Sequence, residues 1–333
     1  MQAVIFDILQ ILLFPGILFL VTYAFLLEWL DRKIYARIQS RVGPLITGPK
    51  GILQPFADFI KLLSKEDITP AAADKLGFTI TPLVALFVAL FSLFFIPVIS
   101  YEGIVSFPGD LLFVIFISTV FNIMIILAGY FATSGFSTVG AARAGLQFVG
   151  YEIPFVISMI PVMLIARSIT ISDIVKYQVT LGMPLLLYAP IAFGIFIISG
   201  LAKLERIPFD IPDAETEIAS GWRVEYSGKK LAILKLASDL KILFVSSLAT
   251  TLFLGGPTGP MIFIEPINSF VMFFVKTIAI SFILSYLRGI FARYRIDQML
   301  RGFWYILLPL ALIQLGLAVL YVYSPEIFSF WGW

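Results

Sequence analysis

Residues 109–131 read GDLLFVIFISTVFNIMIILAGYF, and this unbroken apolar run decides the class of fold. Its one charged residue, Asp110, stands at the start. A helix needs about 20 mostly apolar residues to cross the hydrocarbon layer of a membrane. The run does not alternate between polar and apolar residues, which argues against a strand of a membrane β-barrel. It therefore predicts a transmembrane helix.

Similar runs elsewhere predict an all-α integral membrane protein, with 1–333 forming a single membrane domain. The eight expected spans are 8–30, 77–100, 109–131, 149–168, 183–203, 231–254, 263–287 and 303–323. The composition agrees, because 60% of the residues are hydrophobic and 13% are charged. Soluble domains average about 45–50% apolar and about 25% charged residues. A water-soluble globular enzyme is therefore excluded.

The distribution of basic residues predicts an orientation. The connections between spans 1 and 2, 3 and 4, 5 and 6, and 7 and 8 together hold 18 of the 23 Lys and Arg residues. Such loops face the cytoplasm in membrane proteins. We therefore expect a multi-pass protein of the cell (inner) membrane, with long cytoplasmic loops and both termini outside.

The sequence contains neither Cys nor His. Disulfides, zinc fingers, thiolate-held iron–sulfur clusters and haem ligated by Cys or His cannot be built from this chain. We expect no catalytic centre, no metal site and no cofactor bound by this chain alone. Its chemistry would depend on Asp, Glu, Lys, Arg and Tyr.

The first long loop contains a second type of helix. At about 52–64, apolar residues recur at helical spacing with Gln54, Asp58 and Lys61 between them. This pattern predicts an amphipathic helix that lies in the membrane interface, because it is too short and too charged to span. It could serve as a peripheral anchor, or as a wall or gate for an amphiphilic substrate that enters from the bilayer.

The cytoplasmic loop 203–230 is rich in acids. Its six carboxylates within 21 residues are Glu205, Asp210, Asp213, Glu215, Glu217 and Glu225. A charge run of this kind is often a solvated surface. Here the acids alternate with Ile, Pro, Phe, Trp and Tyr, so part of the loop should be buried. Clustered, partly buried carboxylates have coupled, raised pKa values that suit proton binding near neutral pH.

Charges inside the predicted spans extend this acidic set. Glu28 lies late in span 1, Glu152 begins span 4, Asp239 and Lys241 lie in span 6, and Lys276 lies deep in span 7. A charge at the centre of the bilayer costs on the order of 3 kcal/mol on insertion scales, so such residues usually face a polar cavity. Glu28 and Glu152 lie near the inner boundary and could instead extend to the interface. We expect an ion or proton relay formed by Glu152, Asp239, Lys276 and the loop carboxylates Asp210, Asp213, Glu215, Glu217 and Glu225.

Four motifs resemble those of the complex I membrane subunit that is called H in bacteria and NADH dehydrogenase subunit 1 in mitochondria. They are DRKIYARIQSRVGPLITGPKGILQPFADFIKLLSKE (31–66), AGLQFVGYE (144–152), RIPFD (206–210) with EY (225–226), and RYRIDQ (293–298). The resemblance covers almost the whole chain, and its motifs occur in the family's order.

The resemblance implies a subunit that joins a hydrophilic redox arm to an antiporter-like membrane arm. Its partners would be soluble iron–sulfur and large catalytic subunits, other membrane subunits and the lipid bilayer, with no nucleic acid. Iron–sulfur clusters, and in a hydrogenase nickel–iron, would sit on those partners, and a quinone could enter a chamber in the cytoplasmic loops. The residues expected to line that chamber or to dock partners are Asp31, Arg32, Arg41, Asp58, Lys203, Glu205, Arg206, Arg293, Arg295 and Asp297.

Two departures from the family pattern leave the electron acceptor open. The family's Glu-Arg-Lys becomes Asp31-Arg32-Lys33, and its Ala-Glu-x-Asn-Arg becomes Ala202-Lys203-Leu-Glu205-Arg206. These changes, with the absence of Cys, favour an archaeal, thermophilic, ferredoxin-dependent hydrogenase or sulfur reductase that pumps H⁺ or Na⁺. The alternative is the quinone-chamber subunit of an NADH:quinone oxidoreductase. A stand-alone secondary transporter is the rival from another class.

Overall fold

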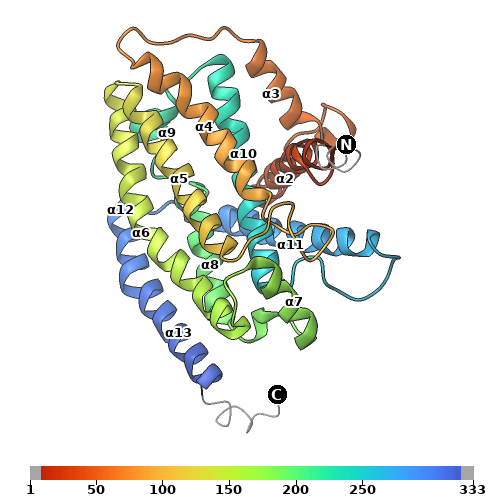
Figure 1. The fold of residues 1–333 in the computed structure, drawn as a ribbon. Coiled ribbons are helices and arrows are strands. Elements are labelled where there is room, and N and C mark those ends of the chain that lie inside the picture. Colours follow the sequence, from red (N-terminus) through yellow and green to blue (C-terminus); the bar gives the residue numbers. More distant parts are fainter. Residues whose placement is uncertain (1–8, 324–333) are drawn as a thin grey trace.

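The computed structural model describes residues 9–323, and all regular secondary structure within that range is helical (Figure 1). Six helical stretches are long and apolar enough to cross a membrane. They are Leu9–Ile38, Lys75–Leu93, Asp110–Phe131, Gly135–Ala166, Ile267–Ile290 and Ile296–Tyr323. The prediction of an all-α, multi-pass membrane protein is therefore confirmed. The first residue of the first predicted span, residue 8, lies outside the described range.

Helix α10 (Gly228–Leu254) is the centre of the bundle. It packs against α4 (Lys75–Leu93), α2 (Ile17–Ile38) and α11 (Ile267–Ile290). Most of its residues are buried, and its second half is rich in small residues such as Ser, Ala and Thr. Small residues let neighbouring helix backbones approach closely in membrane proteins. This composition explains how α10 can be enclosed by other helices.

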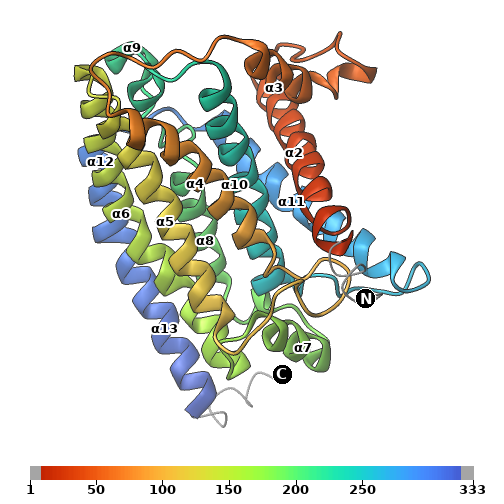
Figure 2. The same ribbon diagram turned by 45° about the horizontal axis from the view of Figure 1, so that its top comes forward.

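A layer of long helices covers one side of α10. Helices α4, α5 (Asp110–Phe131), α6 (Gly135–Ala166) and α13 (Leu308–Tyr323) lie side by side in both ribbon views (Figures 1 and 2). Adjacent members of this layer pack on one another. Helices α2 and α11 form a second group on the other side of α10, as Figure 2 shows.

The fifth predicted span is shorter than expected. Residues 183–203 form a 3₁₀ turn, Leu185–Leu187, and then α8 (Pro190–Lys203). Fourteen residues of α-helix extend about 21 Å, less than the roughly 30 Å of a hydrocarbon core. The break follows from Pro184 and Pro190, which lack the N–H group that a continuing helix needs.

The fourth predicted span starts too late. Helix α6 begins at Gly135 rather than at 149, so the expected loop before span 4 is helical. Its early turns pack on a 3₁₀ turn, Gly221–Arg223, where a side chain at Gly140 would come within 2.7 Å of the Trp222 backbone nitrogen. Glycine at this position therefore permits the close contact that holds the extension.

The remaining elements complete the loops and the last span. Helix α3 (Gln54–Ser64) lies at the place of the predicted amphipathic segment, and α9 (Glu215–Ile218) is a single turn in the acidic loop. Helix α7 (Ile171–Leu181) was not predicted. Helix α12 (Ile296–Arg301) and a π-helical segment, Gly302–Leu307, lead directly into α13.

The four base-rich connections meet at one end of the bundle, which we call the basic end. Lys230 Nζ lies 3.0 Å from Asp67 Oδ1, Arg143 Nη1 lies 2.5 Å from Glu217 Oε2, and the Tyr294 backbone N–H donates to the Pro208 carbonyl. Helices α3 and α9 are both at this end, whereas α7 lies at the opposite end (Figure 2). The sequence correctly grouped these loops on one side.

Candidate functional site

Arg206 connects the acidic loop to the transmembrane helices. Its guanidinium lies 2.6 Å from Glu28 Oε2 and is also paired with Asp31, both on α2. Asp31 is shared with Arg288 of α11 and accepts a hydrogen bond of 2.7 Å from Ser285 Oγ. One arginine from the loop thus joins α2 and, through Asp31, α11. Burial disfavours the charged form of Arg206, but Asp31 and Glu28 outweigh it and raise its pKa.

The same cluster reaches α3 through Arg32. Arg32 Nε lies 2.9 Å from Glu28 Oε1, and its Nη1 lies 2.7 Å from Asp58 Oδ2. Asp58 also accepts a hydrogen bond of 2.9 Å from Gln54. Burial works to raise the pKa of Asp58, but the bonds from Arg32 and Gln54 prevail and lower it. Asp58 therefore stays ionised at neutral pH and fixes α3 to α2.

We call these six residues the arginine cluster: Glu28, Asp31, Arg32, Asp58, Arg206 and Arg288. Three acids face three arginines, so the cluster is neutral as a whole. Asp239 of α10 is 4% exposed and interacts electrostatically with Glu28 and Arg206. Asp239 therefore adds a buried acid beside the neutral arginine cluster. Lys235, a basic residue on the same helix, also interacts with it electrostatically.

The acidic loop forms a second group with basic residues of α6 and the loop before α12. Asp210 Oδ1 lies 3.2 Å from Arg293 Nε, and Glu217 lies 2.5 Å from Arg143 and 3.7 Å from Arg293. Burial raises the pKa of Asp210 although Arg293 opposes it. At the exposed Glu217, the hydrogen bond from Arg143 lowers the pKa.

Asp213 is the acid best suited to exchange a proton near neutral pH. Its carboxylate is 13% exposed and lies 2.8 Å from Arg223. Burial raises its pKa to about 7; Arg223 works in the other direction, and Glu205 and Asp210 add to the rise. Its Oδ1 atom has no hydrogen-bond partner among the described residues. Asp213 therefore changes charge in the range where cells operate.

Deeper in the bundle, Lys203 and Glu152 form an ion pair. Lys203 Nζ lies 3.1 Å from Glu152 Oε2 and 3.0 Å from Ser118 Oγ, and the Lys203 side chain is 1% exposed. Thr119 donates to the other oxygen of Glu152 at 2.8 Å. Lys203 replaces the acid of the family pattern, and its charge is neutralised by Glu152.

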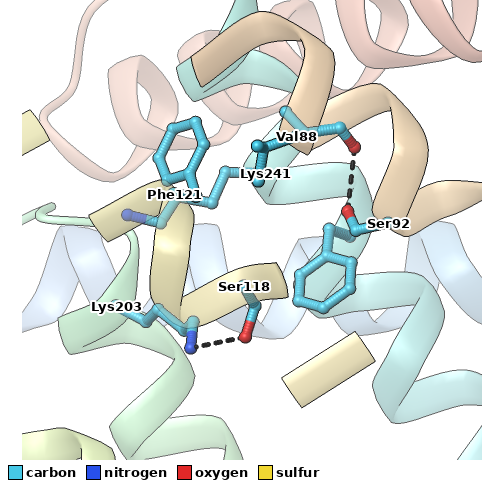
Figure 3. Close-up of a pocket in the computed structure, with 8 residues that line it drawn as sticks. Val88, Ser92, Ser118, Phe121, Lys203 and Lys241 are labelled. Carbon is cyan, nitrogen blue, oxygen red and sulfur yellow. Dashed lines mark hydrogen bonds between the residues drawn. The ribbon is translucent and has the colours of Figure 1, made fainter. Parts of the chain in front are cut away.

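A small cavity between α4, α5, α8 and α10 receives two lysines (Figure 3). We call it the lysine cavity. Its lining residues are Val88, Ala89, Ser92, Ser118, Phe121, Lys203, Lys241 and Phe244. Figure 3 shows the Lys241 chain beside the Phe121 ring and the bond from Lys203 to Ser118. The Lys241 ammonium lies 4.7 Å from the centre of that ring.

Comparison with known proteins relates this chain to one family. The family model described as NADH dehydrogenase matches residues 10–319. The chain is 37% identical over 297 residues to the H subunit of NADH-quinone oxidoreductase from Dehalococcoides mccartyi, covering 89% of this chain and 82% of the relative. The chain belongs to the family of complex I H subunits, the NADH dehydrogenase subunit 1 family.

Further relatives extend the match. An NADH-quinone oxidoreductase H subunit of Geobacter sulfurreducens, the second of that name, is 38% identical over 303 residues, covering 88% of this chain and 90% of the relative. The H subunit of Bacillus cytotoxicus is 38% identical over 317 residues, covering 95% and 93%. All three relatives are bacterial, and the predicted archaeal and thermophilic origin finds no support in them.

In this complex I H subunit, Lys276 lies apart from the other predicted relay residues. Its Nζ donates to the carbonyls of Leu254, Gly256 and Thr258 at 2.6, 3.2 and 2.5 Å. Leu254 is the last residue of α10, so Lys276 caps the carbonyl end of that helix. Within the described residues no carboxylate pairs with it, and its contacts point to a structural role.

Several predicted residues lie on the surface of the basic end. Arg295 and Asp297 are exposed and line a groove of about 360 Å³ with Arg143, Glu217 and Arg293. Arg41 is exposed, with its guanidinium 5.6 Å from the Tyr35 ring centre. Glu215 is also exposed, whereas Glu225 and Glu205 are partly buried. These positions separate the predicted residues that are exposed from those inside the bundle.

The prediction of site residues omitted Glu28, Lys241 and Arg288. The sequence marks Glu28 and Lys241 as charges inside predicted spans, but neither entered the predicted relay or chamber set. Arg288 follows the seventh predicted span and resembles an ordinary flanking base, so only its contact with Asp31 reveals its place. Among the described residues, no group of three or more Asp, Glu, His or Cys residues is arranged to hold a metal ion.

Proposed function

We propose that this chain is the membrane subunit that connects the peripheral redox arm to the ion-pumping arm of a complex I-type enzyme. In this role it couples electron transfer to translocation of H⁺ or Na⁺ through its carboxylates and lysines. The relatives bear the name of the H subunit of NADH-quinone oxidoreductase, which supports this assignment.

The main support for this proposal is that loop 204–227 links the arginine cluster to proton-binding acids. Arg206 lies in the arginine cluster, while Asp213, seven residues later, is a proton-binding group with a pKa of about 7. Asp213 in turn interacts electrostatically with Glu205 and Lys241. A change of charge in the arginine cluster can therefore reach the proton-binding acids through one short segment.

We propose that the electron acceptor binds near the arginine cluster, beside α3. Phe56 and Phe59 of α3 contact Phe25 of α2, with ring centres 6.0 and 5.7 Å apart. Phe56 is 49% exposed, so α3 presents an apolar face near buried charges. This combination suits a quinone that enters from the bilayer, with its polar head toward the cluster and its tail on the aromatic residues.

The names of the relatives favour a quinone over the ferredoxin-dependent hydrogenase and sulfur reductase chemistry that the departures at Asp31, Lys203 and Glu205 suggested. The Lys203–Glu152 pair shows that one of these departures is locally compensated. Iron–sulfur clusters would belong to soluble partner subunits. The exposed groove around Arg295 and Asp297 would contact such a subunit, with small and antiporter-like membrane subunits on the lipid-facing sides.

We propose a topology of eight spans with the basic end in the cytoplasm. The six long apolar stretches would supply six of the spans. Helix α8 with the 3₁₀ turn before it would supply the fifth, and α10 the sixth. Helix α3 would lie in the interface as an amphipathic helix. Both chain termini would then be outside.

The test is the variant Asp213→Asn in the assembled complex, reconstituted into vesicles. We expect electron transfer to quinone to continue and ion translocation to fall, because the variant cannot bind and release a proton at this position. Unchanged translocation per electron would refute the role of Asp213. Solute transport by the purified chain alone would instead favour a secondary transporter.

A further inference from the structure

We infer that Lys241 and the Lys203–Glu152 pair form a proton-exchange unit across the lysine cavity, with one water molecule as the bridge. This inference rests on the proposed coupling function and names the groups that carry the proton inside the bundle. It adds Lys241, which the sequence-predicted relay does not include.

The state of Lys241 is the first observation. The residue is 6% exposed, and no described carboxylate lies within ion-pair distance of it. Its ammonium faces the ring of Phe121, 4.7 Å from the ring centre. A buried lysine whose main support is an aromatic ring can exist as ammonium or as neutral amine, because neither form requires a broken ion pair.

The shared space is the second observation. Lys241 and Lys203 line the same cavity, whose volume of about 10 Å³ is close to the minimum that holds one water molecule. The hydroxyls of Ser118 and Ser92 also face it, and each donates its own proton to a backbone carbonyl of its helix. Ser118 Oγ also accepts from Lys203, so it keeps one acceptor lone pair, and a water in the cavity would find polar partners.

The charged groups around Lys241 are the third observation. Lys241 interacts with Glu205 of the acidic loop, Lys203 of α8, Glu152 of α6 and Arg223 beside the loop. Asp213 of the acidic loop also interacts with Lys241. With Asp213 included, three acids offset the three basic groups, so a proton that moves among these side chains leaves their net charge unchanged.

The exchange is a balanced transfer of one proton. Lys203 first passes a proton to Glu152 across their 3.1 Å contact, which leaves Lys203 as a neutral amine with a free lone pair. The Lys241 ammonium then gives a proton to the water, and the water gives one of its protons to the Lys203 amine. Lys241 is then a neutral amine, Lys203 is again an ammonium, Glu152 is a carboxylic acid, and the water is unchanged. The sum of the three side-chain charges is the same before and after.

Two substitutions of Lys241 test the unit in the assembled complex in vesicles. Lys241→Met removes the ionisable group, and Lys241→Arg keeps a positive charge that is not released. We expect both to lose ion translocation while electron transfer continues. Lys229→Met is the matched control, because Lys229 is an exposed lysine of the same helix, and we expect it to translocate normally.

The outcomes separate this inference from the proposed function. Translocation at the control level in Lys241→Arg, together with its loss in Asp213→Asn, would overturn the lysine unit and leave the coupling role intact. Normal translocation in both would overturn both.

A measurement on the unmodified complex covers the case in which the Lys241 variants fail to assemble. A reaction-induced infrared difference spectrum of complex labelled with ¹⁵N-lysine should contain a lysine band that shifts with the label. Absence of any such band during turnover would overturn the proposal.

Discussion

Lys203 Nζ and Glu152 Oε2 lie 3.1 Å apart, and this buried pair joins α8 to α6. The Lys203 ammonium also lies 4.4 Å from the centre of the Phe155 ring. The family pattern that the sequence resembles has an acid at the position of Lys203, so an ion pair stands here where that pattern implies two acids. The relay that we propose therefore has a different balance of charge.

Removal of one partner of this pair should destabilise the protein. Lys203→Met leaves Glu152 without its ammonium, and breaking a buried ion pair costs about 3–5 kcal/mol. The thermal denaturation temperature of the purified complex should fall. The double variant Lys203→Met with Glu152→Gln should recover much of the loss, and a double variant as unstable as Lys203→Met alone would show that the pair itself is not the cause.

Asp213 should make stability depend on pH. Its folded pKa of about 7 lies above the ordinary aspartate value of 3.8, so between these values the folded state binds more protons than the unfolded state. Stability contributed by this group is present at low pH and is lost as the pH rises toward 7. Asp213→Asn should therefore be more stable relative to the parent at pH 8 than at pH 5. Equal differences in denaturation temperature at the two pH values would contradict the raised pKa.

Arg206 should be replaceable only in part by lysine. Its planar guanidinium contacts both Glu28 and Asp31, and a lysine ammonium cannot reproduce two directed contacts with separate carboxylates. Arg206→Gln should cost about 3–5 kcal/mol, because it leaves buried acids short of a partner. Yield of assembled complex should fall in the order parent, Arg206→Lys, Arg206→Gln, and equal yields would show that the cluster is not needed for the fold.

Lys276 should prove structural. Lys276→Met removes three partly buried hydrogen bonds to the last residue of α10 and the turn after it, and a buried carbonyl without a donor costs at most about 1–3 kcal/mol. The denaturation temperature should drop while the number of ions translocated per electron stays normal. A normal denaturation temperature with impaired translocation would return Lys276 to the relay predicted from the sequence.

The exposed groove at the basic end should affect assembly. Arg295→Glu reverses a charge on a surface that we assign to a soluble partner, so less of the iron–sulfur subunits should copurify. Lys176→Met, an exposed lysine at the opposite end, is the control. Equal copurification in both variants would place the docking surface elsewhere.

The sequence predicted the helical class and the sidedness of the loops because both depend on local composition. Runs such as Asp110–Phe131 matched their predicted bounds closely. It could not predict that α6 starts at Gly135, because that extension depends on contact with Trp222, which is distant in the chain. The shortening of α8 follows from prolines whose effect depends on whether neighbouring helices satisfy the exposed carbonyls.

The candidate site was predictable where charge interrupts an apolar run, as at Glu152 and Asp239. The pairing of those charges was not, since it depends on helices far apart in sequence. Lys276 has the same signal as Lys241, yet one caps a helix end and the other faces a cavity. Composition identifies a buried charge, and only the surrounding atoms separate a structural from a functional one.

The most direct test of the coupling role is the number of ions translocated per electron by the Glu152→Gln complex in sealed vesicles. Glu152 is the acid that accepts the proton in the proposed exchange, and glutamine keeps its shape without its charge. We predict that electron transfer continues and that the ratio of ions to electrons falls well below that of the parent. A ratio equal to the parent's, with electron transfer intact, would contradict the proposed coupling through Glu152.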